Sequence, residues 1–523
     1  MNKLYVFAIG GSGERVMKSL VMMLAAGMPL GAKELVPVFV DNDVKSNALT
    51  SCLDLIDYYR ADPKESGVNL GLHALCRDNN FGQIPTFAHV KIDAPIVLNV
   101  AGNQIGTLDR IIGKLNDSDP VESAIKEEKD LLFTKDDLEM PLTVGFVGNP
   151  NIGSVVLNSL SLQSENFQTI YGDAATKDGV FVIGSLFGGT GAAGFPLIIN
   201  KFRSNDNTHC PLLGGVAVLP YFNIEEGDET NGLLNTEVYD VHSNTFNSKT
   251  RAALMYYDEY MRDMDYMYYV GDNMNPSQYK HYVGGEKQEN PYNIIEVMAA
   301  LSVVDFSKKD VDAARGDVVY EIPVFGINEN GICNLSGIYN PDLKRALVKF
   351  QLMKVMFEGK DFLKWNIDQN HKFTKEILFT KEMRKAVVNK SDLQKYPNAW
   401  GLANMFEQWD KWMKEMGDRN VIKRPFRIFD ATNEPLKNNV TQNFYTDNEN
   451  GIAKTETERE IVFGIPPRYK DKILILSPDI EDAMNKIKLE VKSSISSDKA
   501  LANLLVTISK ALDNVIDNNC NLL

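Results

Sequence analysis

The chain has 523 residues, of which 44% are hydrophobic and 24% are charged, and its formal net charge is −15. This length exceeds what one hydrophobic core usually supports, so we expect two or three domains. The excess of acidic residues argues against general binding to nucleic acid or to an anionic membrane, because both need a basic surface.

The cysteines and the N-terminal region bear on the cellular compartment. Five cysteines stand singly along the chain, and an odd number without paired spacing predicts reduced thiols in a cytoplasmic protein. The six histidines are isolated as well, so we predict no metal site made of side chains alone. The start of the chain is unlike a signal peptide. The apolar stretch Leu20–Leu30 is too short to span a bilayer, and we expect it to be a buried helix without any transmembrane segment.

The first part of the chain alternates short apolar runs with helix-like sequence. Runs that are apolar on both faces and alternate with helices are typical of a parallel sheet covered on both sides. The sequence therefore predicts an α/β fold with a parallel, Rossmann-like sheet and helices on both faces. The predicted strands are Leu4–Ile9, Leu35–Val40, Leu142–Val147, Val180–Leu186, Leu212–Leu219 and Tyr266–Val270.

Two further regions depart from this alternation. Residues 44–140 contain helix-like stretches at Leu108–Leu115 and Val121–Leu132, and we expect an insertion packed on one edge of the sheet. Beyond Asp317 the pattern changes, and Asn340-Pro341 indicates the start of a helix. We predict an α/β domain over 1–317, a divergent α+β domain over 318–476 and a C-terminal helical region over 477–523. One face of the helix after Pro341 carries Leu343, Leu347, Phe350 and Phe357.

The most specific motif is the glycine-rich run Phe187–Gly194, which follows the predicted strand Val180–Leu186 and opens a helix. Such a junction presents unpaired backbone N–H groups and the positive end of a helix dipole, which suits phosphate. The alternative is a tight turn that only allows close packing of helix on strand. The candidate binding residues are Gly188, Gly189, Thr190, Gly191 and Ala192.

A second glycine loop follows the first predicted strand. Its candidate binding residues are Gly10, Gly11, Ser12, Gly13 and Glu14. Alone, it could be half of a dinucleotide fingerprint, in which Asp41 at the end of the next strand would bind a ribose. That fingerprint requires glycine or alanine at position 16, where Val16 stands.

A third glycine loop favours a nucleoside triphosphate over a dinucleotide. Gly148–Gly153 follows another predicted strand, and its candidate binding residues are Gly148, Asn149 and Pro150. A dinucleotide fold does not need glycine loops after three of its strands, whereas a triphosphate ringed by strand ends does. The chain has no Gly-Lys-[Ser/Thr] sequence, which disfavours a P-loop NTPase.

These loops resemble those of the tubulin/FtsZ superfamily, in family order over about Met1 to Leu301. Phe187–Gly194 resembles the GGGTG[ST]G signature, with Phe187 in place of the first glycine and alanines at positions 192 and 193. The other similar runs are Gly10–Glu14 (first glycine loop), Asp41-Asn42-Asp43 (NTD turn), Gly148–Gly153 (GANPEVG-type loop) and Pro220–Gly227 (PFNFEG run).

The resemblance implies a site for GTP or GDP with Mg²⁺, to which the turn Asp41, Asn42 and Asp43 would contribute. It places Glu225 or Glu226 near the ribose. Asn290 or Asn293 would reach the guanine edge, and Tyr292 would stack on the base at the start of a long central helix. The chemistry is reasonable because an asparagine amide both donates and accepts. The alternative is that Asn290-Pro291 only caps this helix.

In filament-forming members of the superfamily, acids after the central helix complete the site of the neighbouring subunit. Here Asp310, Asp312 and Asp317 could orient a water molecule in that way, or they could form a solvated acidic turn. The resemblance thus implies a GTPase that assembles head to tail into filaments, with further partners possible through the C-terminal region. The alternatives are a non-polymerising nucleotide-dependent scaffold or switch, and an NAD-dependent oxidoreductase.

Overall fold

The structure is a computed structural model in which strands and helices alternate over the first three hundred residues. It describes residues 1–62, 69–77, 86–98, 106–115, 118–142, 145–146, 148–159, 165–203, 210–224, 243–261, 264–272, 276–280, 290–313, 317–322, 333–334, 337–358, 399–418, 420–428 and 500–518.

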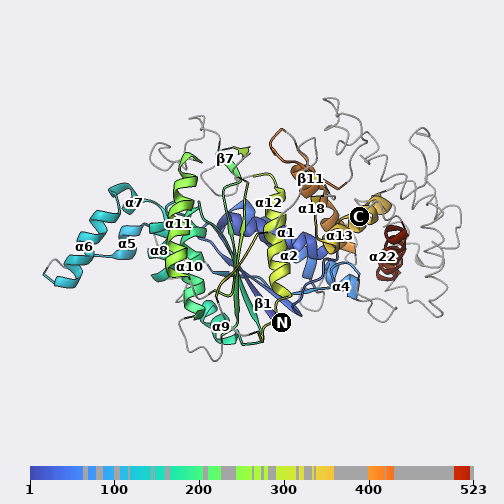
Figure 1. The fold of residues 1–523 in the computed structure, drawn as a ribbon, viewed down its shortest axis with the longest axis horizontal. Coiled ribbons are helices and arrows are strands. Elements are labelled where there is room, and N and C mark those ends of the chain that lie inside the picture. The colour runs from blue at the N-terminus through green and yellow to red at the C-terminus, as the bar shows by residue number, and fades with distance from the viewer. Residues whose placement is uncertain are drawn as a thin grey trace.

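An eight-stranded parallel sheet forms the centre of the fold (Figure 1). Its strands are β1 (Lys3–Ile9), β2 (Glu34–Val40), β3 (Lys91–Ile92), β4 (Ile96–Leu98), β5 (Gly179–Ser185), β6 (Leu212–Val218), β8 (Tyr266–Val270) and β10 (Val319–Glu321). They are ordered β10–β8–β6–β5–β1–β2–β3, and β4 also pairs with β2. In register, Leu4 of β1 lies opposite Leu35 of β2 and Gly179 of β5. The first strand of the chain is therefore an inner strand of the sheet.

Helices cover both faces of this sheet, as the sequence predicts (Figure 1). One face carries α1 (Gly10–Ala25), α2 (Asn47–Arg60), α4 (Leu72–Arg77) and α12 (Ile294–Ser307), and the other carries α8 (Pro150–Ser159), α9 (Glu165–Asp173), α10 (Gly189–Arg203) and α11 (Phe246–Tyr260). Alternate side chains of β1 enter the two cores: Val6 faces α1, and Phe7 faces α10. Strands buried on both faces explain the apolar runs in the sequence.

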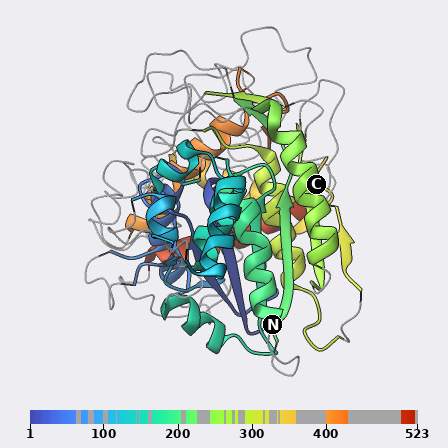
Figure 2. The ribbon, with the colours of Figure 1, turned by 90° about the vertical axis from the view of Figure 1, so that its left-hand side faces the viewer.

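The remaining elements lie around this three-layer body. The helices α5 (Leu108–Ile112), α6 (Pro120–Leu132) and α7 (Lys135–Glu139) project on one flank, as Figures 1 and 2 show. Two short parallel pairs join β7 (Phe222–Ile224) to β9 (Ser277–Tyr279), and β11 (Cys333–Asn334) to β12 (Phe426–Arg427). The later helices are α13 (Pro341–Glu358), α18 (Trp400–Met416) and α22 (Ala500–Asn518), and a 3₁₀ turn, Ser243–Thr245, precedes α11.

The fold class and five of the six predicted strands are confirmed, while the strand predicted at Leu142–Val147 is wrong for its described residues. Leu142, Gly145 and Phe146 lie outside any strand. Gly145 has φ +82°, which breaks a regular strand. Leu142 and Phe146 are buried in the core beside α8 and α10, so their apolar character comes from packing and not from the sheet.

The C-terminal helices share a core with the sheet domain. Asn340 caps α13, because its side-chain oxygen accepts a hydrogen bond from the nitrogen of Leu343 at 2.9 Å. Buried side chains of α13, α18 and α22 belong to the same apolar cluster as those of α1 and α2. The boundary between 317 and 318 stays a prediction, and the 477–499 part of the last region lies outside the described residues.

Two sequence predictions concern the compartment. Of the buried helix predicted over Leu20–Leu30, Leu20–Ala25 is the buried end of α1, whereas residues 26–30 lie beyond the helix, which ends before Gly27 with its φ of +96°. Cys52, Cys76 and Cys210 are buried free thiols. Among the helices that the structure describes, none is both long and apolar enough to cross a bilayer.

Candidate functional site

The sheet has a switch point between β1 and β5, where the chain leaves two neighbouring strands into helices. β1 ends at Ile9 and α1 begins at Gly10, while β5 ends at Ser185 and α10 begins at Gly189. The chain continues from β1 to β2 in one direction and adds β5 on the other side. In open α/β sheets, ligands bind outside the carboxyl ends of the strands at such a point.

The three glycine loops meet at this switch point, with Thr190 between them. A Cβ atom built on Gly10 would lie 3.2 Å from the Cβ of Thr190, and one on Gly145 would lie 4.0 Å from the Thr190 hydroxyl. A Cβ on Gly189 would lie 3.2 Å from the nitrogen of Gly148. Gly10 and Gly148 have φ values of +66° and +72°, which other residues rarely adopt. Loops that are far apart in the sequence thus form one surface.

The glycines at this surface serve two different purposes. A Cβ on Gly13 would lie 2.8 Å from the carbonyl carbon of Ala8, and one on Gly191 would lie 2.7 Å from the nitrogen of Ser185. These two glycines allow helix and strand to pack closely. By contrast, no atom of the described residues lies within 4 Å of a Cβ built on Gly11. Within the part of the chain that the structure describes, the first turn of α1 therefore borders space that a ligand could occupy.

The starts of α1 and α10 are suited to an anion. Ile9 occupies the N-cap position of α1, and no side chain of the described residues caps this end. Neither helix has an acidic residue in its first turn. The free N–H groups of the turn Gly10–Gly13, which includes Ser12, and the dipoles of two adjacent helices attract negative charge. Such an arrangement fits the phosphate groups of a nucleotide.

The other predicted residues of these loops make contacts within the protein. The Asn149 side chain caps α8, accepting from the nitrogen of Asn151 at 3.1 Å, and Pro150 is the first residue of that helix. The carbonyl oxygen of Ala192 accepts from the Tyr257 hydroxyl at 3.1 Å. A Cβ on Gly188 would approach only the side-chain oxygen of Ser185, at 2.7 Å, among the described atoms.

The acidic turn after β2 lies beside the second turn of α1. The side chains of Glu14, Asp41, Asn42 and Asp43 are all buried. Ser46 donates to one carboxyl oxygen of Glu14 at 3.2 Å, and the other oxygen has no partner among the described residues. Burial and the neighbouring Asp41 raise the pKa of Glu14 well above its ordinary value. Burial also raises the pKa of Asp41 to about 6.

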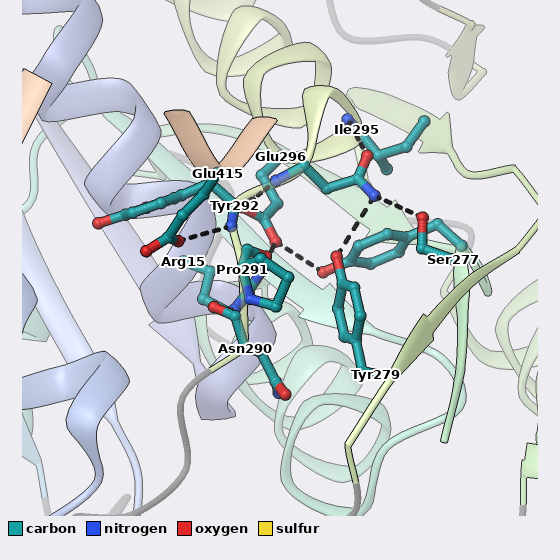
Figure 3. Close-up of polar contacts among 11 residues, drawn as sticks. Arg15, Ser277, Tyr279, Asn290, Pro291, Tyr292, Ile295, Glu296 and Glu415 are labelled. Atoms are coloured by element: carbon teal, nitrogen blue, oxygen red, sulfur yellow. Dashed lines mark hydrogen bonds and ion pairs between the residues drawn. The ribbon is translucent and has the colours of Figure 1, made fainter. Parts of the chain in front are cut away.

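A buried polar network on the other side of α1 joins this helix to the start of α12 (Figure 3). Arg15 forms an ion pair with Glu296, and its Nε lies 2.7 Å from a carboxyl oxygen of Glu296. The same guanidinium donates to the carbonyl oxygens of Asn290, at 2.7 Å, and of Pro291. Tyr221 donates its hydroxyl to Glu296 at 2.9 Å. Arg15 thereby fixes the segment 290–293 against α1.

The three residues expected to contact the base differ in their surroundings. Asn293 is the N-cap of α12 and forms a capping box with Glu296, so the alternative that Asn290-Pro291 caps this helix is wrong. Tyr292 is buried, and the ammonium group of Lys18 lies 4.5 Å from its ring centre. The side-chain oxygen of Asn290 is buried without a partner among the described residues. Of these three residues, Asn290 is therefore the one whose acceptor is unused within the described structure.

Lys249 on α11 is a residue that the sequence analysis missed. Its ammonium group donates to the carbonyl oxygen of Gly148 at 2.9 Å. Phe187, which stands where the superfamily has glycine, packs against Phe246, the first residue of α11, with ring centres 4.8 Å apart. Nothing in the sequence marks this lysine, because it lies 101 residues from the loop that it contacts.

The predicted acids lie at the opposite end of the sheet. Asp312 forms an ion pair with Lys177, which lies two residues before the start of β5, and Asp317 lies two residues before the start of β10. Asp310 accepts a hydrogen bond from the nitrogen of Asp312 at 2.9 Å, and all three acids are exposed. Seven-residue strands separate these amino ends from the glycine loops by roughly 23 Å. Glu225 and Glu226 lie outside the described residues.

No side-chain cluster in the described ranges could hold a metal ion by itself, since none brings together three His, Cys, Asp or Glu residues. Mg²⁺ commonly binds through one or two side chains together with the phosphates of a nucleotide. The surface at the switch point is compatible with that mode, in which the nucleotide brings most of the ligands.

No family model and no curated protein matches the chain. Among solved structures, it is similar to CetZ from Methanosaeta thermophila (17% identity, TM-score 0.26, covering 58% of this chain and 54% of that one). It is also similar to a point mutant of FtsZ from M. jannaschii (14%, 0.25, 52% and 46%) and to a GTPγS-bound protofilament of CetZ2 from Haloferax volcanii (13%, 0.28, 62% and 64%). The chain spans less than two thirds of each of these structures. With such low TM-scores, the fold assignment rests on the strand order and the glycine loops described above.

Proposed function

We propose that this chain binds a guanine nucleotide, GTP or GDP, at the switch point between β1 and β5. The supporting observation is that two adjacent parallel strands run into glycine-rich helices, and no described residue fills the space beside Gly11. Phosphate groups would accept hydrogen bonds from the backbone at the starts of α1 and α10, and from the hydroxyl of Thr190.

The base of the nucleotide would lie toward Asn290. Gly11 and Arg15 are four residues apart and share one face of α1, and Arg15 holds the backbone of Asn290. An asparagine amide can accept from and donate to the guanine edge, and the side-chain oxygen of Asn290 has no partner within the described chain. Asn293 and Tyr292 are engaged in the contacts above, so we assign base recognition to Asn290.

We further propose that hydrolysis requires a second copy of the chain docked head to tail. GTP would supply the bond to be broken, and Mg²⁺ would supply positive charge that stabilises the transition state. Asp310, Asp312 or Asp317 of one copy would orient water at the glycine loops of the next. The acids and the loops lie at opposite ends of the sheet, as a head-to-tail contact requires.

A dinucleotide-dependent oxidoreductase is the second candidate. The strand order and the acid at the end of β2 also fit a dinucleotide-binding fold, in which Asp41 would accept from ribose hydroxyls. Against it, Val16 is fully buried at the position where the fingerprint requires glycine or alanine. Asp41 accepts instead from the nitrogen of Asp43 at 3.0 Å.

Calorimetry with GDP, GTP, ATP and NAD tests the proposal, using a variant that fills the open space. Gly11→Ala adds one methyl group where it meets no atom of the described chain, so the fold should persist while phosphate approach is blocked. We expect wild type to bind GDP and GTP in preference to the others, and Gly11→Ala to lose at least about tenfold in affinity. Gly189→Ala would be a less specific test, because the added Cβ would lie only 3.0 Å from the nitrogen of Asn149 and would disturb the neighbouring loop.

Gly172→Ala in α9 is the matched control, since its Cβ also meets no described atom within 4 Å but lies away from the glycine loops. It should bind like wild type. Tight binding of NAD without any response to guanine nucleotides would replace the proposal by the second candidate. Equal affinities of wild type and Gly11→Ala would show that the ligand binds elsewhere.

A further inference from the structure

Lys249 brings a positive charge to the third glycine loop. Its ammonium group is half-buried and donates to the carbonyl oxygen of Gly148 at 2.9 Å. An ammonium group has three donors, so this contact leaves others available. In the described part of the chain, no carboxylate lies within 4.0 Å of it, and burial alone lowers the pKa of Lys249. A half-buried cation without a counter-ion among these residues is suited to an anionic ligand.

Two other cations of the described chain, both on α1, already have partners. Arg15 is paired with Glu296 and with two backbone carbonyls. Lys18 donates to the hydroxyl of Ser51 at 2.8 Å and lies over the ring of Tyr292. Lys249 differs from both because its one described contact is to a carbonyl of the loop itself.

Contacts with α10 hold Lys249 in place. Phe246 packs on Phe187 at 4.8 Å between ring centres, and this anchors the start of α11 to the signature loop. Two turns beyond Lys249, Tyr257 donates to Ala192 at 3.1 Å and stacks on Phe195 with ring centres 5.4 Å apart. Lys249 lies between these two anchors, so α11 presents it to the loop from a fixed position.

The binding residues follow one another across the switch point in a fixed order. Asn290 is held by α1, Gly10 of α1 lies against Thr190 of α10, and the start of α10 lies against Gly148. Lys249 follows, in contact with the carbonyl oxygen of Gly148. A nucleotide with its base toward Asn290 and its phosphates along α1 and α10 would direct its last phosphate toward Lys249.

From this order we infer that Lys249 binds the terminal phosphate and makes the site distinguish a nucleoside triphosphate from a diphosphate. The inference rests on the proposed function. Lys249 strengthens the binding of the triphosphate alone, because the phosphates of a diphosphate end before they reach the third glycine loop. An ammonium–phosphate contact is a charge-assisted hydrogen bond, and its loss should be measurable as a change in affinity.

The test is calorimetry with GDP and with the slowly hydrolysed analogue GTPγS. Lys249→Gln keeps a donor for the Gly148 carbonyl and removes the charge, and Lys249→Arg keeps the charge. We expect Lys249→Gln to lose about tenfold in affinity for GTPγS and to bind GDP like wild type. Lys249→Arg should keep most of the wild-type preference for GTPγS over GDP. The exposed Arg251 on the same helix provides the control Arg251→Gln, which changes net charge equally and should change neither affinity.

The possible outcomes separate this inference from the proposed function. Equal losses for GDP and GTPγS would show that Lys249 only supports the loop, and unchanged affinities would show no role, so both results overturn the inference. Wild-type protein that binds neither nucleotide would overturn the proposed function and the inference with it. Thermal unfolding in the presence of each nucleotide gives a second measure of the same ratio if a variant is partly unfolded.

Discussion

Glu14 and Asp41 place two carboxyl groups together where water does not reach them. Both are at most 5% exposed, and burial raises the pKa of each carboxyl group. The neighbouring Asp41 adds to this rise for Glu14, and the neighbouring Asp43 adds to it for Asp41. Two neighbouring carboxylates in one buried site cannot both ionise freely. This pair therefore makes the stability of the nucleotide-free protein depend on pH.

Asp41→Asn tests this dependence. The pKa of Asp41 is raised from 3.8 to about 6 in the folded protein, so the folded state binds more protons between these values. Wild-type stability should then fall as pH rises from about 4 to above 6. Asp41→Asn keeps an acceptor for Asp43 and should be more stable than wild type by about 1 to 3 kcal/mol at about pH 8, with the gain vanishing below about pH 4.

Urea unfolding at several pH values measures the difference. Asp54→Asn is the control, because Asp54 is exposed on α2 and its replacement should follow the wild-type profile. A gain for Asp41→Asn that stays constant with pH would show that the pair does not titrate in this window.

At the level of single residues, sequence predicts which loops matter better than which of their residues meet a ligand. Gly11 and Gly13 look alike in the sequence, yet one borders open space and the other packs on Ala8. Both roles select glycine, and only the atom opposite the missing Cβ separates them. Lys249 could not be found at all, because its partner is distant in sequence.

Among the elements, the start of α12 gives different roles to two nearby asparagines, Asn290 and Asn293. Asn293 accepts from the nitrogen of Ile295 at 3.1 Å and donates toward the hydroxyl of Tyr279 at 3.3 Å, which ties the cap to β9. Asn290 lies outside the cap. Its backbone is held by Arg15, while its side-chain oxygen remains available within the described structure.

Exchanging each asparagine should separate stability from recognition. Asn293→Ala should lower the free energy of unfolding by about 1 kcal/mol through loss of the cap, and Asn293→Ser should restore most of it. Asn290→Ala should leave stability within about 0.5 kcal/mol of wild type and reduce the preference for GDP over ADP. Chemical unfolding and calorimetry measure the two effects. A large stability loss in Asn290→Ala with unchanged nucleotide preference would contradict the assignment.

The strands were predictable as elements because burial on both faces leaves continuous apolar runs. The end points of Tyr266–Val270 agree with β8, and those of the other strands of this type differ by a residue or so. The strand prediction at Leu142 was wrong because an apolar run indicates only that a segment is buried. It does not show whether the buried segment is a strand, a helix or a turn. The turn at Gly145, with φ +82°, decides against a strand, and that value depends on tertiary contacts.

For the whole molecule, the two ends of the sheet carry different chemistry. The glycine loops lie at the carboxyl ends of the strands, and the exposed acids Asp310, Asp312 and Asp317 lie at the amino ends. If the second copy completes the site, turnover per molecule should rise with protein concentration. A switch that acts alone would show constant turnover.

Alanine at each of these acids should then slow turnover while leaving GTP affinity nearly unchanged, because the groups act on the neighbouring copy. Asp312→Ala also removes a surface ion pair with Lys177, which should cost less than about 1 kcal/mol in stability. Asp130→Ala, at an exposed site on α6, is the control and should turn over like wild type. Turnover against concentration, with sedimentation in GTP, measures this. Flat turnover and a monomer in GTP would leave the scaffold alternative.

The ion pair between Arg15 and Glu296 has a consequence for synthesis on the ribosome. The two residues are 281 positions apart in the sequence. In the same way, β1 has a neighbouring strand on each side only after β5 has been synthesised. At about 5 to 20 residues per second, the guanidinium of Arg15 is made roughly 15 to 55 s before its carboxylate partner. During that interval the apolar surface of α1 has no α12 to cover it. The packing of α1 is therefore completed well after the helix itself is made, and over that interval the nascent chain is exposed to misfolding at α1.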